Sequence, residues 1–423
     1  MTETRRRPID GRATCVDAVE SFLEAVAQRD GDLRAFVQID SKRLRAEAAM
    51  HDAVPQEARG PLHGQLVAVK EVFDVAGYTC AWGTPIHRDR IPTKDAAAVR
   101  LLRDAGAIIA GVTVSTEYAM SRVGPTVNPW DPARTPGASS QGSAAAVGAG
   151  LLPLALGSQT IGSVIRPAAY CGCVGFKPTW GMIDVAGSMP LAAPIDHVGY
   201  LASSTDLARS ALAVLAPGLD SAVRPDRVIA MQPWYEAATD ADVTAAVASA
   251  VEVLGATGLA VEQAKLPAWI TQTEAQVLDT ILAHGMARSH AADFDRAADR
   301  MTQRIRDYIA RGRALPESTY AAALQDRERI ANALDELLGD GVALIPATTG
   351  IAPLLRDGTG SRAPQRLWTL AGCPATTVPF GQAAGMPLAV QIVAARGHDH
   401  AVLAAAAQLE ASAPGLSTAT RTI

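Results

Sequence analysis

The chain has 423 residues and a formal net charge of −5, and 48% of its residues are hydrophobic against 19% that are charged. This composition can build a large core, excludes a largely disordered chain and does not suggest a nucleic-acid-binding surface. The usual ~100–200 residues per domain would allow two to four domains, although large α/β enzymes often exceed that allowance as one unit.

The cysteines and the N-terminal segment indicate a reducing compartment. Five cysteines are scattered along the chain without CxxC spacing, which argues against a disulfide framework and against a zinc site. The N-terminus starts with basic residues but no apolar run follows, so we expect no signal peptide. The most apolar stretch, residues 144–156, is shorter than the ~20 residues that span a bilayer. We therefore expect a soluble cytoplasmic protein that binds neither membranes nor nucleic acid.

The first third of the chain alternates between helical and strand patterns. Thr14 and Asp17 form a capping box ahead of apolar residues at helical spacing. The expected elements are a helix after Thr14, a helix from Ser41, a strand over 64–75, a helix over 95–105 and a strand over 106–114. Such alternation predicts an α/β fold.

The rest of the chain falls into three stretches of different composition. Residues 124–187 are rich in Gly, Ser, Thr and Pro around an Ala-rich helix over 141–152, and residues 203–340 are Ala-rich and predict helices with solvated faces. Strands are expected again over 342–349, 374–380 and 388–395, followed by a helix over 400–411. We find no internal repeat and no long linker, so one elaborated domain is the simpler expectation.

The Gly-rich segment contains a group of hydroxyl side chains. Ser and Thr in loops commonly cap helices or close turns, and Ser140 and Ser143 fit that role because the helix over 141–152 starts there. Ser163 differs, because the consecutive N–H groups of residues 160–163 can form a nest for an anionic oxygen, which acyl transfer needs. The hydroxyls are Ser139, Ser140, Ser143, Ser158, Thr160 and Ser163.

A serine nucleophile needs a base, and two side chains are candidates. None of the eight histidines lies in the Gly-rich segment, and His197, the nearest, fits a buried, hydrogen-bonded role better. Lys70 lies inside an apolar strand, where burial lowers the pKa of an amine until it can act as a general base. At this point the residues leave open whether Lys70 is that base or pairs with Glu71 or Asp74.

Several motifs together resemble the amidase signature family of serine hydrolases. The resemblance is carried by VAVKEVFDVAG around Lys70, TPGASSQGSAAAVGAG around Ser139 and GSQTIGSVIRPAAYCGCVGFKPTWG around Ser163. The spacing between the two serines also agrees with the family pattern. Further matches lie at residues 116–120, 128–137, 190–199, 344–350 and 370–381.

The resemblance implies a Ser-cisSer-Lys triad. Ser163 would be the nucleophile, Ser139 a bridging serine that follows a cis peptide bond, and Lys70 the base. The oxyanion hole would be formed by the N–H groups of Thr160, Ile161 and Gly162. The implied reaction is hydrolysis of an amide or carbamoyl carbon–nitrogen bond of a small molecule through a serine acyl-enzyme, which releases ammonia or an amine without metal or organic cofactor.

The fold that the resemblance implies is α/β, a large mixed and twisted β-sheet flanked by helices on both faces, in a single domain over residues 1–423. Residues 60–200 would form the catalytic core, and residues 215–335, which match no family motif, a variable and mainly helical region on the substrate side. Residues 340–412 would supply the strands and the helix that complete the sheet.

The chain departs from the family pattern close to the nucleophile. Gln159 stands where an aspartate is usual and Arg166 is shifted by one residue, so the ion pair that can support the site is not expected in the same form. Ile161 replaces a common glycine and adds a bulky side chain near the acyl group, which predicts a narrow pocket. We expect Tyr118 and Met120 to form walls of that pocket.

Rival interpretations account for fewer residues. A-x-S-x-G at 138–142 approximates the nucleophile elbow of α/β-hydrolases, but the proline-rich segment before it does not suit the strand that an elbow needs. GSQTIGS has the glycine spacing of a P-loop without its lysine. Within the family, an A-type amidotransferase component that hydrolyses glutamine for a partner complex is the alternative. A non-catalytic scaffold is disfavoured by Lys70, Ser139 and Ser163, and homodimer formation is left open.

Overall fold

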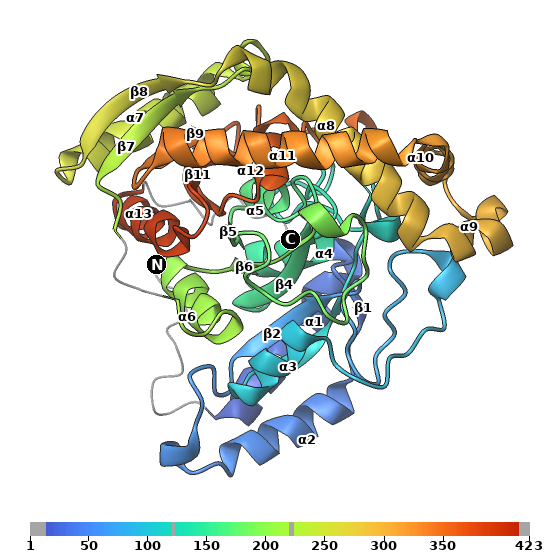
Figure 1. The fold of residues 1–423 in the computed structure, drawn as a ribbon. Coiled ribbons are helices and arrows are strands. Elements are labelled where there is room, and N and C mark those ends of the chain that lie inside the picture. The colour runs from blue at the N-terminus through green and yellow to red at the C-terminus, as the bar shows by residue number, and fades with distance from the viewer. Residues whose placement is uncertain (1–13, 121–122, 220–223, 414–423) are drawn as a thin grey trace.

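The strands form one large sheet in the computed structural model, which describes residues 14–120, 123–219 and 224–413 (Figure 1). They are β1 (Phe36–Gln38), β2 (Leu66–Lys70), β3 (Ile108–Thr113), β4 (Leu154–Gln159), β5 (Val174–Lys177), β6 (His197–Ala202), β7 (Arg227–Gln232), β8 (Ala260–Lys265), β9 (Val342–Pro346), β10 (Ala375–Ala383) and β11 (Met386–Ala394). Their order across the sheet is β1-β3-β2-β4-β6-β5-β10-β11-β9-β7-β8. β2 pairs in parallel with β3 and β4, and β7 does so with β8 and β9, whereas the other neighbours are antiparallel. The predicted mixed sheet is therefore confirmed.

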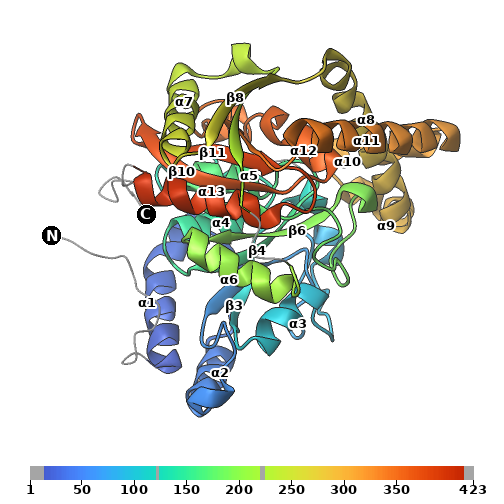
Figure 2. The same cartoon turned by 60° about the vertical axis from the view of Figure 1, so that its left-hand side comes forward.

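Helices cover both faces of this sheet (Figures 1 and 2). Those in the described residues are α1 (Cys15–Leu33), α2 (Ser41–Asp52), α3 (Ala97–Asp104), α4 (Gln141–Gly148), α5 (Ile165–Cys171), α6 (Thr205–Leu215), α7 (Ala241–Ala256), α8 (Ala268–Ser289), α9 (Ala291–Ala297), α10 (Gln303–Ala314), α11 (Glu317–Leu338), α12 (Ala363–Ala371) and α13 (Asp399–Ser412). The predicted α/β class is confirmed by this arrangement.

Side-chain alternation along the strands serves two separate cores. On β2, Val67 and Val69 pack in a cluster with α3, α6 and α13, whereas Leu66 and Ala68 pack in a cluster with α1, α4 and α5. A strand buried on both faces has a continuous apolar sequence, as this one does. Lys70 ends the strand two residues after Ala68, on the face that α4 covers.

Local signals set the helix starts near the N-terminus. Thr14 accepts a hydrogen bond from the N–H of Asp17, whose carboxylate accepts one from the N–H of Thr14, so the predicted capping box is present at α1. The predicted start of α2 at Ser41 is also confirmed, with Asp40 as its capping residue. These caps satisfy N–H groups that have no partner within the helix.

Several predicted elements differ in extent from the observed ones. The strand expected over 64–75 ends at Lys70, and the helix expected over 141–152 ends at Gly148, because Gly150 has a positive φ of 72° and Pro153 follows. Within residues 215–335, predicted as mainly helical, β7 and β8 extend the sheet at its edge. On β8 only Ala264 is even partly buried, so the strand has little apolar alternation to reveal it.

Helices α8, α10, α11 and α12 pack on one another at one side of the molecule (Figures 1 and 2). A very close approach occurs at Gly312 in α10, where a Cβ atom would lie 2.6 Å from the carbonyl carbon of Ala283 in α8. Only glycine allows these two backbones to approach so closely.

Two findings in the described residues concern membrane spans and cysteines. No helix among them is long and apolar enough to cross a membrane. All five cysteines lie within the described ranges, and each is buried and outside any disulfide.

The contact between α8 and α10 gives a stability prediction. Gly312→Ala should lower the free energy of unfolding by about 1–3 kcal/mol, because the new methyl group overlaps backbone that has little room to move. Gly31→Ala in α1 is the matched control, since a Cβ there meets no atom within 4 Å. The control should be neutral or gain up to ~1 kcal/mol from the better helix propensity of alanine. Chemical denaturation of both variants measures this, and equal stability would contradict the close approach.

Candidate active site

The candidate active site lies where β2 and β4 end. Lys70 is the last residue of β2, and Ser158 and Gln159 are the last two residues of its parallel neighbour β4. Ser139 and Ser140 immediately precede α4, which packs on both strands. Ligands of α/β sheets commonly bind beyond the carboxyl ends of parallel strands, and this is such a place.

Lys70 is held between two serine hydroxyls. Its Nζ lies 2.7 Å from Ser139 Oγ and 2.9 Å from Ser158 Oγ, and the side chain has no exposed surface. Burial lowers the pKa of Lys70 to about 7, although the charges of Glu71 and Asp196 raise it. Among the described residues no carboxylate lies within ion-pair distance of this amine, so the alternative of a salt bridge to Glu71 or Asp74 is wrong.

Ser139 follows a cis peptide bond, as the family resemblance implied. The bond joins Ala138 to Ser139, and Gly137 before it has a φ of +85°. A Cβ atom on Gly137 would lie 2.9 Å from the Cα of Pro167, so the segment passes directly against α5. Both the turn and the contact require glycine at this position.

Ser163 lies beside this segment in the loop between β4 and α5. The N–H of Ser140 donates to the Ser163 carbonyl over 3.2 Å, and Ser163 itself is 7% exposed. In the described part of the chain the N–H groups of Thr160, Ile161, Gly162 and Ser163 donate to no backbone or side-chain acceptor. These donors are therefore available to an oxygen atom of a ligand that contacts the loop.

Gln159 fixes the loop from its N-terminal side. Its Oε1 accepts hydrogen bonds from the N–H groups of Val164 (2.8 Å) and Ile165 (3.1 Å), and its Nε2 donates to Thr369 Oγ1 over 2.9 Å. The Thr369 hydroxyl in turn donates to the Ile161 carbonyl over 2.6 Å. A neutral side chain thus caps α5 and ties the loop to α12.

Arg166 is the second residue that departs from the family pattern, and its side chain bonds to backbone carbonyls. Its fully buried guanidinium donates to the Ala138 carbonyl over 2.8 Å and to the Gly360 carbonyl over 2.7 Å. Burial lowers the pKa of Arg166 to about 10, so the side chain stays charged at neutral pH. The cis peptide oxygen and the loop before α12 are therefore held by the same cation.

Asp196 joins the loop to the segment before β6. Its carboxylate accepts from Thr160 Oγ1 over 2.7 Å and from the N–H groups of Leu191 and Ala192, each over 2.8 Å. The neighbouring His197 is buried, as predicted, with its Nδ1 2.9 Å from the Ile195 carbonyl, and burial holds its pKa well below the usual range. A histidine of this kind stays neutral at physiological pH.

The predicted pocket residues are found in two different regions. Ile161 lines a cavity of about 410 Å³ together with residues of α8, α10 and α12. Tyr118 and Met120 are buried and do not line that cavity. The Tyr118 hydroxyl donates to Asp293 over 2.8 Å and its ring contacts His290, with ring centroids 4.4 Å apart.

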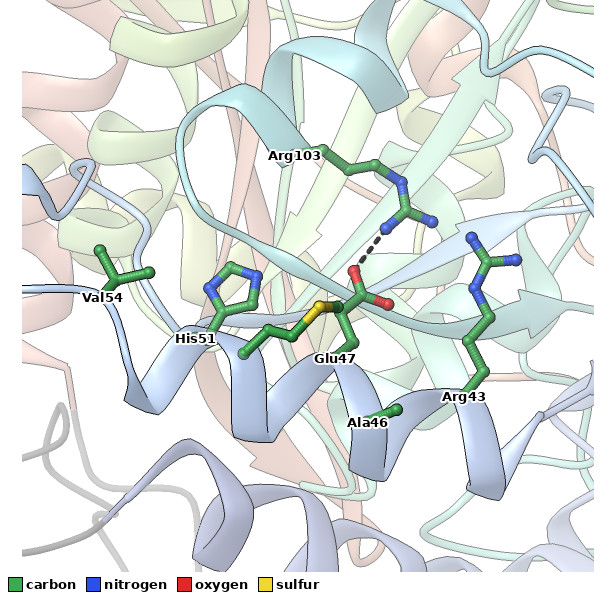
Figure 3. A pocket seen from close by; sticks show the side chains of 7 residues that line it. Arg43, Ala46, Glu47, His51, Val54 and Arg103 are labelled. Carbon is green, nitrogen blue, oxygen red and sulfur yellow. Dashed lines mark hydrogen bonds and ion pairs between the residues drawn. The ribbon is translucent and has the colours of Figure 1, made fainter.

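A second hollow lies at the surface between α2 and α3 (Figure 3). Its lining is mostly contributed by α2, and Arg103 of α3 forms an ion pair with Glu47 across it. Lys70 and the two serines do not line this hollow, so it is separate from the candidate active site.

Three residues with a role in this geometry were not predicted from the sequence. In the sequence Ser158 is only one of several hydroxyls, and its position at the end of the strand next to Lys70 is the signal that would have selected it. Thr369 and Asp196 are distant in sequence from the loop they hold, and residue types alone do not bring them there. In the described residues no group of three His, Cys, Asp or Glu side chains is arranged to hold a metal ion.

Comparison with known proteins gives these residues a family context. The family model "Amidase" matches residues 17–403. The chain is 33% identical over 449 residues to AtzE, a 1-carboxybiuret hydrolase subunit of Pseudomonas sp. strain ADP, covering 95% of each protein. It is 36% identical over 294 residues to the A subunit of glutamyl-tRNA(Gln) amidotransferase from Salinibacter ruber, which covers 63% of this chain and 57% of that protein. A crystal structure described as an amidase superposes with a TM-score of 0.86 at 31% identity, covering 96% of this chain and 97% of that one.

The burial of Lys70 predicts a pH-dependent stability. The pKa of Lys70 falls from an ordinary 10.5 to about 7 on folding, so between these values the unfolded chain binds more protons than the folded chain. This group therefore makes the wild-type protein more stable as pH rises from 7 to 10.5, and Lys70→Met lacks that gain. We expect the stability of the variant relative to wild type to decrease by roughly 3–5 kcal/mol over that window in denaturation curves.

The matched control is Lys177→Met. Lys177 is equally buried and burial also lowers its pKa to about 7, but its Nζ donates to the carbonyls of Pro178 (2.9 Å) and Cys373 (2.5 Å). The control should show the same pH trend with a lower stability throughout, because two buried carbonyls lose their donor. A stability difference for Lys70→Met that does not change with pH would contradict the lowered pKa.

Proposed function

Because the chain belongs to the amidase family and acts on carbon–nitrogen bonds, we propose that it hydrolyses a small amide through an acyl-enzyme on Ser163. The observation that carries this proposal is the contact of Lys70 with Ser139. A buried amine with a pKa of about 7 has a substantial neutral fraction at physiological pH, and it lies 2.7 Å from a hydroxyl that can relay a proton.

The first half of the reaction forms the acyl-enzyme. Ser163 Oγ attacks the amide carbonyl carbon while its proton passes to Ser139 Oγ, and the proton of Ser139 passes to Lys70 Nζ. The oxyanion of the tetrahedral intermediate is stabilised by the N–H groups of Thr160, Ile161 and Gly162. The carbon–nitrogen bond then breaks, and Lys70 returns the proton through Ser139 to the leaving nitrogen, which departs as ammonia or an amine.

The second half regenerates the enzyme. Water attacks the acyl carbonyl, gives one proton to Lys70 through Ser139, and the ester bond to Ser163 breaks as Ser163 Oγ regains a proton. The products are a carboxylic acid and the free enzyme, so no oxidant, metal or organic cofactor enters the balance. The Ser158 hydroxyl, 2.9 Å from Lys70 Nζ, supports this cycle by orienting the amine toward Ser139.

A second candidate is an amidotransferase A-type subunit that hydrolyses glutamine within a partner complex. The similarity to the A subunit of glutamyl-tRNA(Gln) amidotransferase favours it, while the neutral Gln159 and the shifted Arg166 disfavour it. Ammonia release from a panel of aliphatic, aryl and carbamoyl amides by the purified chain alone separates the two. If glutamine is the one amide that is hydrolysed, and ammonia appears only when partner subunits are added, the stand-alone hydrolase is wrong.

The formation of a homodimer and a cytoplasmic location stay predictions.

The nucleophile assignment predicts the behaviour of Ser163→Ala. The variant should lose at least ~10³-fold in turnover and all labelling by a serine-directed fluorophosphonate, with an unchanged fold by circular dichroism. Ser143→Ala is the matched control, because this buried hydroxyl on α4 donates to the Leu156 carbonyl over 2.8 Å and serves the packing. The control should keep both turnover and labelling. Near-native turnover in Ser163→Ala would sink the assignment.

The base assignment predicts a pH profile. Activity should rise as Lys70 loses its proton, with an apparent pKa of about 7 in kcat/KM, and chelators should leave it unchanged. Glu71 is the first of the charges that raise the pKa of Lys70, so Glu71→Gln should move the midpoint to lower pH. The new amide oxygen can still accept from the N–H of Ser115, which the Glu71 carboxylate does over 2.8 Å. A midpoint that stays in place or moves upward would count against Lys70 as the base.

A further inference from the structure

The cavity beside Ile161 has an unbalanced positive charge in its lining. Ile161, two residues before Ser163 in the same loop, lines the cavity, which has a volume of about 410 Å³, the size of a small-ligand site. Its remaining lining residues are Ala275, Gln276, Leu278, Asp279, Tyr308, Arg362 and Arg366.

Two of the charged lining residues are neutralised by partners. Arg366 donates to the fully buried carboxylate of Glu274 through Nε (2.8 Å) and Nη2 (2.5 Å). Asp279 accepts from the Tyr308 hydroxyl over 2.9 Å and forms an ion pair with Arg311 at 2.7 Å. Arg366 and Asp279 therefore add no net charge to the cavity, because each forms an ion pair.

Arg362 is the lining residue whose charge is not balanced. It is half-buried, and among the described residues no carboxylate lies within ion-pair distance of its guanidinium. Burial and then the charge of Arg304 lower the pKa of Arg362, while Tyr308 raises it. An arginine in this setting keeps its proton, so a positive charge remains at the cavity wall.

Two further cations strengthen this positive field. Arg304 is exposed and does not line the cavity, but it lies over the Tyr308 ring at 5.9 Å from its centroid and forms no ion pair with the described residues. Arg166 is near enough that Arg362 and Arg304 both lower its pKa, and its bond to the Gly360 carbonyl fixes the loop that carries Arg362. Arg362 therefore brings a positive charge to the lining that no carboxylate there balances, because Asp279, the one carboxylate in the lining, is already paired with Arg311.

A desolvated cation is costly unless an anion accompanies it. We propose that the cavity binds a carboxylate of the substrate through Arg362, so that the enzyme acts on small amides that also carry a carboxylate group. This inference rests on the proposed amide hydrolysis and narrows its substrate class. A planar guanidinium matches a carboxylate in a bidentate geometry, which makes Arg362 the residue that determines this specificity.

The first test measures binding without turnover. Succinate and glutarate, added to Ser163→Ala, should raise its melting temperature, whereas the neutral succinamide and glutaramide should have little effect. Arg362→Gln in the same background should lose the stabilisation, and Arg356→Gln should keep it. Arg356 is the matched control because it lies in the segment before α12 with a side chain that is 80% exposed. Equal stabilisation by the acids and the diamides, or by inorganic phosphate and the acids, would overturn carboxylate recognition.

The second test measures selectivity in turnover. The ratio of kcat/KM for a carboxylate-bearing amide to that for its neutral analogue is compared for two pairs, succinamate with succinamide and N-acetyl-β-alanine with its amide. A preference for the acid in either pair supports the proposal. A preference for succinamate places the carboxylate on the acyl side of the bond that is cleaved, and a preference for N-acetyl-β-alanine places it on the amine side. Arg362→Gln should lower that ratio by roughly 10- to 100-fold, the value of a charge-assisted hydrogen bond, and Arg356→Gln should leave it unchanged.

The two tests separate this inference from the proposed function. If fluorophosphonate labels Ser163 and neutral amides are hydrolysed without preference for the acids, amide hydrolysis stands and the carboxylate subsite is wrong. If dicarboxylates stabilise the protein through Arg362 and Ser163 is not labelled, the subsite stands and the nucleophile assignment is wrong.

Discussion

The burial of Lys70 is the constraint on which the rest of the site depends. A lysine without exposed surface and without a carboxylate at ion-pair distance has a large desolvation cost unless it is neutral. The two hydroxyls of Ser139 and Ser158 satisfy the neutral amine, and together they fix its orientation. The same burial that destabilises the charged form therefore lowers the pKa of Lys70 to about 7, which suits the role of a base that we propose for it.

The two departures from the family pattern acquire separate roles in the structure. Gln159, in place of an aspartate, uses both ends of its amide to cap α5 and to bond Thr369, so it needs no cationic partner. Arg166, shifted by one residue, instead donates to the cis peptide carbonyl of Ala138 and to Gly360. A neutral hydrogen-bond network around the loop thereby replaces the ion pair of the family pattern, and the Arg166 guanidinium bonds to backbone carbonyls.

The class of fold could be predicted from the sequence because its elements are encoded locally. The triad of Lys70, Ser139 and Ser163 came from the family resemblance and stays a prediction. Capping residues set α1 and α2, and an apolar run around Lys70 set a buried strand. The end of that strand and the strands β7 and β8 were not predicted, because tertiary pairing decides them. Ser158 illustrates the same limit within the site, since its contact with Lys70 depends on the pairing of β4 with β2.

The cavity could not be predicted for a related reason. Its lining comes from the loop after β4 and from α8, α10 and α12, which lie more than a hundred residues further along the chain and cover a region without recognised motifs. The proposed proton relay, by contrast, runs from Ser163 through Ser139 to Lys70, and Lys70 and Ser158 lie at the ends of two neighbouring strands. In the proposed function, reaction chemistry and substrate choice therefore belong to different parts of the chain. The guanidinium of Arg166 bonds to both parts, through the cis peptide oxygen of Ala138 and through the Gly360 carbonyl in the loop that precedes Arg362.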